Sequence, residues 1–329
     1  MNLSAIDKAA RIAIVECMGA KPEETILVIS DVVKRKIGLI LFENAKALGY
    51  STLYCEMPPN TRDGQEPPSE VAKLMLDYDV VFCPTSTSLT HTTARRNASL
   101  NGARVATFPG ITEEVMIRGL NADYKKISRL SLDLKAILET GEKIRVTAPN
   151  GTDISFSIMG RNVYASKGLF HAKGESGNLP TGETYLAPVE GTTNGVFVVD
   201  GSMAGLGLIK NANIKIVVEN GYAVDISGGP MAEKLDEILK EVDSPNAYNI
   251  AEFGIGTNDK AKLSGVLLED EKVLGTIHIA LGNNKSMGGS IDVPVHLDGV
   301  VKKPTIYLDD KILMKNGKLL LKNFSDIAN

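Results

Sequence analysis

The sequence predicts an α/β protein. An N-terminal parallel-sheet α/β layer domain, residues 1–141, precedes a β-dominated α+β domain, residues 142–329. The 329 residues suffice for about two domains of roughly 150 residues each. Glycine is distributed unevenly: residues 1–140 hold only seven of the 31 glycines. Strand-like and helix-like segments alternate in the first part, whereas turn dipeptides separate strand-like segments in the second part. The two parts therefore predict different architectures.

The first part alternates short apolar runs with helical patterns. Strands are predicted at residues 26–30, 52–57, 80–85 and 105–108. Helices are predicted at residues 32–49, 69–78 and 111–120. This alternation is typical of a parallel sheet covered by helices. A further helix is predicted after Asn121 and ends at Gly141, where we place the domain boundary.

The second part is rich in hairpin signals. Asn-Gly or Asp-Gly lies between apolar runs at four places: Asn150-Gly151, Asn220-Gly221, Asp298-Gly299 and Asn316-Gly317. These dipeptides supply the positive φ values of a type I′ turn, so each is predicted to join two antiparallel strands. One helix is predicted between the hairpins, at residues 231–242.

Composition excludes several classes of function. There are 36 Lys and Arg against 40 Asp and Glu, a net charge of −4, with no block of like charges. This balance gives no electrostatic basis for binding nucleic acid or an anionic membrane. Charged residues interrupt the N-terminal segment, and no apolar run approaches the roughly 20 residues of a membrane span. With three unpatterned cysteines, we expect a cytoplasmic protein with reduced thiols.

Two common kinds of active site find no support. No strand-to-helix turn in the first part carries GxGxxG or GxxxxGK[ST], which disfavours nucleotide binding. No GxSxG motif is present, and Cys83 lies at the end of a predicted buried strand, which disfavours a serine or cysteine hydrolase.

Potential metal ligands gather in the second part. His296 and Asp298 are two residues apart on a predicted strand and therefore share one face. His278 lies in another apolar strand, and Glu183 and Glu252 adjoin further strand-like segments. Each residue alone also suits a core or surface position. Imidazole and carboxylate groups from four segments of one domain are nevertheless what a one- or two-metal hydrolytic site requires, and three carboxylates favour two metals over one.

At these segments the sequence resembles the thermophilic aminopeptidase family of metallopeptidases, of the aminopeptidase T and aminopeptidase S type. The matching motifs are Asn178-Leu-Pro-Thr-Gly-Glu183, Ala251-Glu252, His278-Ile-Ala-Leu-Gly282 and His296-x-Asp298, with Thr87-Ser-Leu-Thr-His91 and Gly102-Ala-Arg-Val in the first part. The resemblance covers most of the chain.

The resemblance implies a two-metal aminopeptidase that removes the N-terminal residue of small peptides and forms a homodimer. The implied ligands of the two divalent ions (Zn, Co, Mn or Mg) are Glu183, Glu252, His278, His296 and Asp298. The metals would activate a bridging water, and Glu183 or Glu252 would shuttle its proton.

One position departs from the peptidase pattern. The family carries a catalytic Tyr seven residues after the first His, whereas this chain has Lys285 there. We expect the segment from Gly282 to Gly289 to border the metal site. Either Lys285 or a Tyr from elsewhere, Tyr185 or Tyr307, is expected to stabilise the oxyanion.

Two alternatives follow from the same residues. A related ring-cleaving branch, the 2,5-dihydroxypyridine dioxygenases, is implied to use the counterparts of His278, His296 and Asp298 as a facial triad for Fe(II). That reading leaves Glu183 and Glu252 without a metal, and because both lie in well-matched motifs we favour the peptidase. The departure at Lys285 also suits an inactive metal-binding relative.

Overall fold

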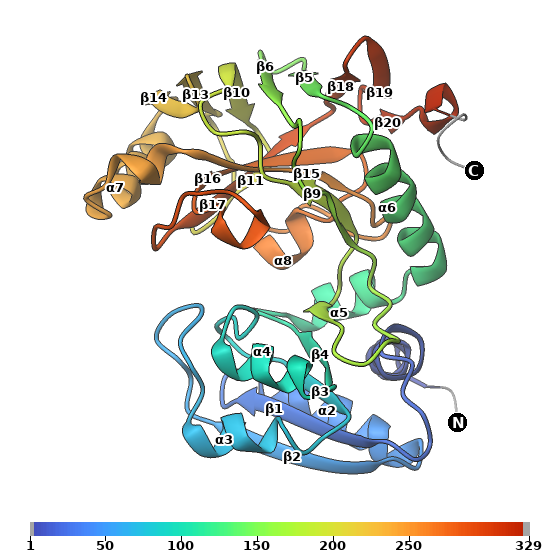
Figure 1. The fold of residues 1–329 in the computed structure, drawn as a ribbon. Coiled ribbons are helices and arrows are strands. Elements are labelled where there is room, and N and C mark those ends of the chain that lie inside the picture. The colour runs from blue at the N-terminus through green and yellow to red at the C-terminus, as the bar shows by residue number, and fades with distance from the viewer. Residues whose placement is uncertain (1–2, 325–329) are drawn as a thin grey trace. The chain divides into compact units, whose positions relative to one another are not determined.

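The structure of the chain is a computed structural model that describes residues 3–324, and it is an α/β protein as the sequence predicts (Figure 1). It contains one parallel sheet and two antiparallel sheets. The chain forms two compact units. Unit 1 comprises residues 1–128 and 166–181, and unit 2 comprises residues 129–165 and 182–329. No helix among the described residues is long and apolar enough to cross a membrane.

Unit 1 is a five-stranded parallel sheet in the order β2-β1-β3-β4-β8. Its strands are β1 Thr25–Asp31, β2 Ser51–Met57, β3 Val80–Cys83, β4 Arg104–Thr107 and β8 Ser176–Asn178. Its helices are α1 Ala5–Arg11, which continues into a π-helical turn at Ile12–Cys17, α2 Arg35–Ala47, α3 Ser69–Leu74, α4 Thr93–Leu100 and α5 Glu113–Leu120. The four strands and three helices predicted for this part are confirmed.

Helices cover both faces of this parallel sheet. Leu27 and Ile29 of β1 pack in one apolar cluster with Val71 of α3 and Ala98 of α4. Side chains alternate along a strand, so the neighbouring residues of β1 point to the opposite face, where α2 packs against β1 and β2. Each face of the sheet therefore buries apolar side chains, which explains the continuous apolar runs in the sequence.

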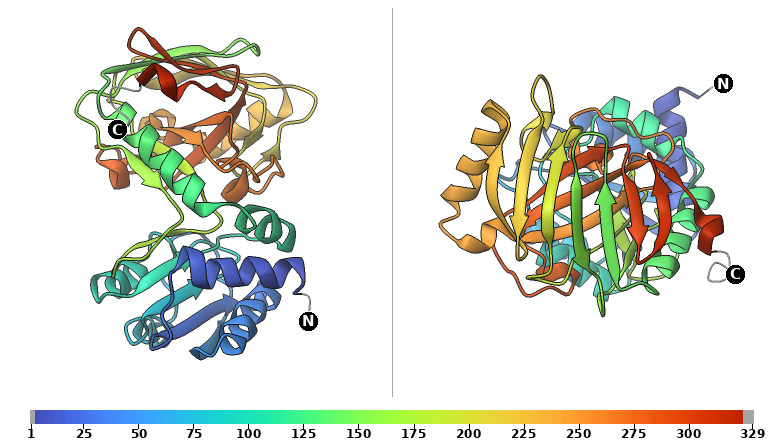
Figure 2. Two further views of the ribbon diagram at one scale, coloured as in Figure 1. Left: turned by 90° about the vertical axis from the view of Figure 1, so that its right-hand side faces the viewer. Right: turned by 90° about the horizontal axis from the view of Figure 1, so that it is seen from above.

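Unit 2 stacks two antiparallel sheets. The eight-stranded sheet has the order β14-β13-β10-β6-β5-β18-β19-β20, and the seven-stranded sheet has the order β12-β11-β17-β16-β15-β9-β7. Figure 2 shows the eight-stranded sheet from above, with its strands side by side. Apolar residues of both sheets form one core, in which Phe156 and Phe253 approach to 5.2 Å between ring centroids. The seven-stranded sheet thus buries one of its faces in this core.

The elements of unit 2 have the following bounds. The strands of the eight-stranded sheet are β5 Lys143–Thr147, β6 Asp153–Ser157, β10 Asn194–Val199, β13 Ile214–Glu219, β14 Tyr222–Ser227, β18 Thr305–Leu308, β19 Lys311–Lys315 and β20 Lys318–Leu319. Those of the seven-stranded sheet are β7 Tyr164–Ser166, β9 Glu183–Leu186, β11 Ser202–Met203, β12 Gly207–Leu208, β15 Ile250–Gly256, β16 Thr276–Gly282 and β17 His296–Lys302. The helices are α7 Pro230–Glu241 and α8 Leu267–Asp270, with short 3₁₀ turns at Pro245–Tyr248, Lys285–Met287 and Leu321–Phe324.

Three of the four predicted hairpins form. The turns at residues 150–151, 220–221 and 316–317 join β5 to β6, β13 to β14 and β19 to β20. The turn predicted at Asp298-Gly299 is wrong, because both residues lie inside the continuous strand β17. A Cβ on Gly299 would come within 2.5 Å of a methyl group of Val199, so this glycine permits a close approach between strands rather than a turn.

The division into units differs from the single boundary expected at residue 141. Helix α6, Tyr124–Leu138, begins in unit 1, and from Arg129 onward it belongs to unit 2. Leu134, Ile137 and Leu138 of this helix lie in the core of unit 2. The chain then returns to unit 1 for residues 166–181, which add strand β8 beside β4.

Candidate metal centre

Four adjacent strands of the seven-stranded sheet supply the predicted ligands. Glu252 lies on β15, His278 on β16, and His296 and Asp298 on β17, while Glu183 begins β9. These strands are neighbours in the order β17-β16-β15-β9. Antiparallel pairing therefore converts four distant segments of sequence into one contiguous surface.

The register places these side chains on one face. Glu252 pairs with Ala280, and Ala280 pairs with Asp298, so the three form a row across the sheet. His278 and His296 lie two residues from Ala280 and Asp298 and share their face. The small side chain of Ala280 leaves space between the two carboxylates. Ile277, Ile279 and Leu281 alternate with these positions and lie in the core on the opposite face.

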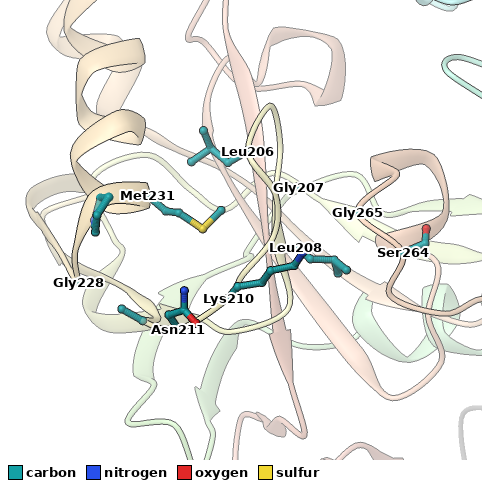
Figure 3. Close-up of a pocket in the computed structure, with 11 residues that line it drawn as sticks. Leu206, Gly207, Leu208, Lys210, Asn211, Gly228, Met231, Ser264 and Gly265 are labelled. Carbon is teal, nitrogen blue, oxygen red and sulfur yellow. The ribbon is translucent and has the colours of Figure 1, made fainter.

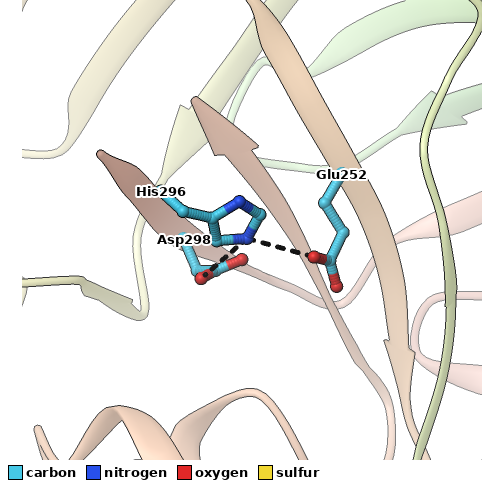
Figure 4. Close-up of side chains that lie close together, drawn as sticks. All are labelled: Glu252, His296 and Asp298. Carbon is cyan, nitrogen blue, oxygen red and sulfur yellow. Dashed lines mark ion pairs between the residues drawn. The ribbon is translucent and has the colours of Figure 1, made fainter. Parts of the chain in front are cut away.

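Three of the predicted ligands converge closely (Figure 4). Glu252, His296 and Asp298 each offer a ligand atom within 4.8 Å of the others. His296 Nε2 lies 3.0 Å from Glu252 Oε2 and 3.5 Å from Asp298 Oδ2. Both carboxylates are buried, whereas about a third of the His296 side chain is exposed. The cluster is thus enclosed by protein on the carboxylate side and open beside the imidazole.

The other two predicted ligands adjoin this cluster. His278 Nε2 lies 3.2 Å from Glu252 Oε1 and 3.6 Å from Glu183 Oε2. Both residues are buried, with His278 only 1% exposed. Gly254, the cross-strand partner of His278, makes this position available, because a Cβ there would lie 2.0 Å from His278 Nε2. All five predicted ligands therefore belong to one polar cluster, although they are not equidistant from one point.

The electrostatics of the cluster favour a bound cation. Burial opposes charge on His296, but Asp298 and Glu252 outweigh it and raise the pKa of this imidazole well above its usual range. Burial likewise opposes charge on His278, but Glu252 and Glu183 raise its pKa to about 9. Despite burial, the histidines hold the pKa values of Glu252 and Asp298 below the usual range for carboxyl groups. Without a metal, protons therefore occupy the positions of positive charge.

A backbone contact orients His296. Its Nδ1 lies 2.7 Å from the carbonyl oxygen of Asn283, so Nδ1–H donates to that oxygen and Nε2 faces the carboxylates. Glu190 stabilises the loop that contains Asn283, because its carboxylate accepts hydrogen bonds from the Asn284 side chain and the Ser290 backbone N–H. Burial opposes ionisation of Glu190, but these bonds and Arg161 lower its pKa to about 2.

A buried lysine, which the sequence analysis missed, completes the cluster. Lys272 Nζ lies 2.7 Å from Glu183 Oε1 and 2.6 Å from Glu271 Oε2. Burial raises the pKa of Glu271 to about 8. In sequence both residues belong to the run Glu269-Asp-Glu-Lys272, which is typical of an exposed turn. The only signal for them was that this run closely precedes the apolar strand of His278.

Two unpartnered oxygens show that these residues fit a metal ion. Among the described residues, Asp298 Oδ1 and Glu183 Oε2 are buried without a hydrogen-bond partner. Buried carboxylate oxygens are stable only when paired or bound to a cation. One imidazole and two carboxylates within reach of one point are ligands that Fe, Mn and Zn ions accept.

The residues expected to stabilise an oxyanion lie elsewhere or have other partners. The Lys285 side chain is 64% exposed, and its Nζ lies 2.5 Å from Asp292 Oδ2. Tyr185 is half-buried and stacks on Tyr164 with ring centroids 5.4 Å apart. Tyr307 belongs to the eight-stranded sheet, where Arg145 lies over its ring. Lys285 is thus a surface residue of the loop rather than a member of the cluster.

A separate hollow in unit 2 does not compete as a metal site. Figure 3 shows this pocket of about 560 Å³ between the loop at residues 206–212, the start of α7 and Ser264-Gly265. Among the described residues that line it, Lys210 alone is charged, and none is an aspartate, a glutamate or a histidine. Its lining therefore lacks metal ligands.

The fold and the cluster define a metal-binding α/β protein, and comparison with known proteins gives the family. The profile of the NicX family, 2,5-dihydroxypyridine 5,6-dioxygenase, matches residues 11–321. The chain therefore belongs to the 2,5-dihydroxypyridine 5,6-dioxygenase family, which implies a metal cofactor.

Individual relatives agree with this membership. The chain is 26% identical over 219 residues to the 2,5-dihydroxypyridine 5,6-dioxygenase of Pseudomonas putida, a match that covers 63% of this chain and 62% of that relative. The solved structure of 2,5-dihydroxypyridine dioxygenase from Pseudomonas putida KT2440 has the same fold, with a TM-score of 0.84, 19% identity and 97% and 98% of the two chains covered. Wild-type AmpT from Thermus thermophilus shares the fold more distantly, with a TM-score of 0.67, 16% identity and 96% and 99% covered.

These findings correct the function expected from the sequence. The resemblance to the aminopeptidase family holds for the fold, as AmpT shows. The expected metallo-aminopeptidase activity is wrong, because the family profile and the curated relative are both dioxygenases. The protein is therefore not assigned as a peptide-bond hydrolase, and the peptidase roles given to Glu183 and Lys285 no longer apply.

Proposed function

We propose that this chain is a metal-dependent, ring-cleaving dioxygenase that acts on a small dihydroxylated N-heteroaromatic compound of the 2,5-dihydroxypyridine type. The observation that carries the proposal is the convergence of Glu252, His296 and Asp298 in a chain of this family. Non-haem Fe(II) oxygenases commonly use two histidines and one carboxylate. The converging set here supplies the same ligand types as one imidazole and two carboxylates, with the second histidine, His278, 3.2 Å from Glu252. The proposed metal is a single Fe(II).

The proposed ligand set differs from the alternative triad expected from the sequence. That triad was His278, His296 and Asp298, whereas Glu252 takes the place of His278 among the three converging groups. His278 instead contacts both Glu252 and Glu183, and we assign it the role of orienting these carboxylates. The side chain of His296 is about one third exposed, and we assign this side as the one from which a substrate reaches the metal.

The chain's own residues account for binding and proton handling. When bound, Fe(II) supplies a site at which a substrate hydroxyl and O₂ can be held together. Glu183, whose buried Oε2 makes no hydrogen bond and lies 3.6 Å from His278 Nε2, would be the carboxylate that accepts a proton from a substrate hydroxyl. Ala280 lies between Glu252 and Asp298 in the sheet, and its small side chain leaves space for a ligand between the two carboxylates.

Oxygen consumption tests this proposal directly. The purified chain is freed of metal and reloaded with Fe(II) without oxygen. It is then mixed with 2,5-dihydroxypyridine in an oxygen-electrode cell. We expect one O₂ consumed per molecule of substrate, with loss of the aromatic absorbance of the substrate. Glu252→Gln should lower the rate at least roughly 100-fold, because a ligand and its charge are lost. The matched control Glu219→Gln, on the exposed side of β13, should behave as wild type.

The opposite results are equally clear. An Fe(II)-loaded wild-type chain that consumes no oxygen with this substrate would contradict the proposed reaction. Activity that Glu252→Gln retains in full would contradict the proposed ligand set.

A further inference from the structure

The cluster contains more carboxylates than the proposed metal needs. Besides Glu252 and Asp298, it includes Glu183 and Glu271, and all four are buried or nearly so. In the sequence-based interpretation Glu183 was one of five ligands of a two-metal centre. The question is therefore which positive charge balances the two additional carboxylates.

Lys272 supplies that positive charge. Its Nζ lies within hydrogen-bond distance of both extra carboxylates, 2.7 Å from Glu183 Oε1 and 2.6 Å from Glu271 Oε2. The side chain is only 2% exposed. An ammonium group buried this deeply is stable only with close anionic partners. Burial opposes its charge, but the two carboxylates outweigh burial and raise the pKa of Lys272, so the group stays protonated at neutral pH.

The backbone fixes this lysine in place. Lys272 follows α8, and its N–H donates to the carbonyl oxygen of Glu269 at 3.0 Å. Its own carbonyl oxygen accepts from the N–H of Asn258 at 2.8 Å. Gly256, opposite Glu183 in the sheet, allows this segment to approach, because a Cβ there would lie 2.2 Å from the Val273 oxygen. The ammonium is therefore a built-in part of the site rather than a flexible surface group.

We propose that the Lys272 ammonium takes the place of a second metal ion, binds Glu183 and Glu271, and restricts this centre to one divalent ion. The proposal rests on the metal centre of the proposed function, but it concerns the number of ions rather than the reaction. Nζ lies within hydrogen-bond distance of both carboxyl groups and balances the negative charge of Glu183. A divalent ion bound there would need metal–oxygen distances of about 2.0–2.2 Å and would have to displace the ammonium. Lys272 is thus a positioning residue that sets the metal stoichiometry.

Metal content tests the proposal without any assay of activity. Metal-free protein is incubated with excess Co(II) alone and desalted, and the bound cobalt per chain is measured by mass spectrometry. We expect one ion in wild type and two in Lys272→Met, because Met has a similar shape without the charge and leaves Glu183 and Glu271 free to bind. Lys272→Arg, which keeps the charge, and Lys318→Met, an exposed lysine on β20, should both bind one ion.

Several results would overturn the inference. Two ions in wild type would show that Lys272 does not exclude the second, and one ion in a folded Lys272→Met would show the same. If Lys272→Met does not fold, Glu183→Gln provides the test. Because Glu183 is held by Lys272 rather than by the metal, its replacement should leave one cobalt ion per chain. Loss of the single ion in a folded Glu183→Gln would therefore overturn the proposal.

Failure of this inference is distinguishable from failure of the proposed function. A wild-type chain with one cobalt ion and no oxygen uptake would contradict the reaction and leave the stoichiometry intact. A wild-type chain that turns over substrate but binds two ions would contradict the role of Lys272 and the single-ion stoichiometry, and would leave the proposed reaction intact.

Discussion

His296 is held differently at its two ring nitrogens. Nδ1–H donates to the Asn283 carbonyl oxygen, and Nε2 faces the carboxylates of Glu252 and Asp298. Those carboxylates raise the pKa of His296 well above its ordinary value of 6.5 despite burial. The imidazole therefore carries a proton at neutral pH when no metal is bound. A metal ion must displace this proton, since only the neutral ring donates a lone pair.

We therefore predict that metal affinity rises with pH. The pKa of His296 lies above 6.5 in the folded chain. Between pH 6.5 and that raised pKa, the binding of each ion therefore releases one proton from His296. The apparent affinity for Co(II) should increase about tenfold per pH unit in this range and level off above the raised pKa. Calorimetric titration at pH 6.5, 7.5 and 8.5, in two buffers of different ionisation enthalpy, measures both affinity and released protons. A pH-independent affinity without proton release would contradict the proposed role of His296.

At the scale of elements, the pairing of β15 with β16 makes the cluster possible. Gly254 on β15 lies opposite His278 on β16, and the absence of a Cβ leaves room for the imidazole. Ala280 serves the same purpose between Glu252 and Asp298. Small residues on the site face alternate with large apolar residues on the core face of the same strands. The strands therefore provide stability on one face and space for ligands on the other.

The variant Gly254→Ala tests this division. The new methyl group would lie 2.0 Å from His278 Nε2, so the imidazole must move out of the buried cluster. We expect the free energy of unfolding to fall by about 1–3 kcal/mol, as for other overpacked sites, together with weaker Co(II) binding. The double variant Gly254→Ala/His278→Ala removes the overlap and should recover part of the melting temperature. Equal melting temperatures for Gly254→Ala and wild type would show that the two residues are not tightly packed.

At the scale of the whole molecule, local patterns predicted most of the fold. Alternating strands and helices identified unit 1, and Asn-Gly dipeptides identified hairpins of unit 2 because turn conformation depends on neighbouring residues. The Asp298-Gly299 turn was wrong because the reason for that glycine, contact with Val199, is distant in sequence. Lys272 was missed because its burial depends on Glu183, 89 positions earlier in the chain. The candidate metal ligands were thus predictable from sequence, whereas the buried ammonium group of Lys272 that pairs with Glu183 was not.

The return of residues 166–181 to unit 1 also depends on contacts that sequence patterns do not reveal. Strand β8 is only three residues long, and it pairs in parallel with β4. Asn178 accepts a hydrogen bond from the Thr107 hydroxyl at 2.7 Å, and the Phe170 N–H donates to the Cys17 oxygen at 2.7 Å. This segment therefore forms a structural part of the parallel-sheet unit rather than a linker.

We predict that a fragment of residues 1–141 is less stable than a unit 1 chain that joins residues 1–128 to residues 166–181 through a flexible linker of about ten residues. The shorter design lacks β8, which leaves the edge of β4 unpaired. It also exposes Leu134, Ile137 and Leu138, whose partners lie in unit 2. We expect it to aggregate, or to melt at least roughly 3 °C below the joined chain, since about 1 kcal/mol corresponds to 2–4 °C in a domain of about 150 residues. Light scattering after gel filtration and thermal melts measure both outcomes. A monomeric 1–141 fragment that melts as high as the joined chain would show that β8 contributes nothing to the stability of unit 1.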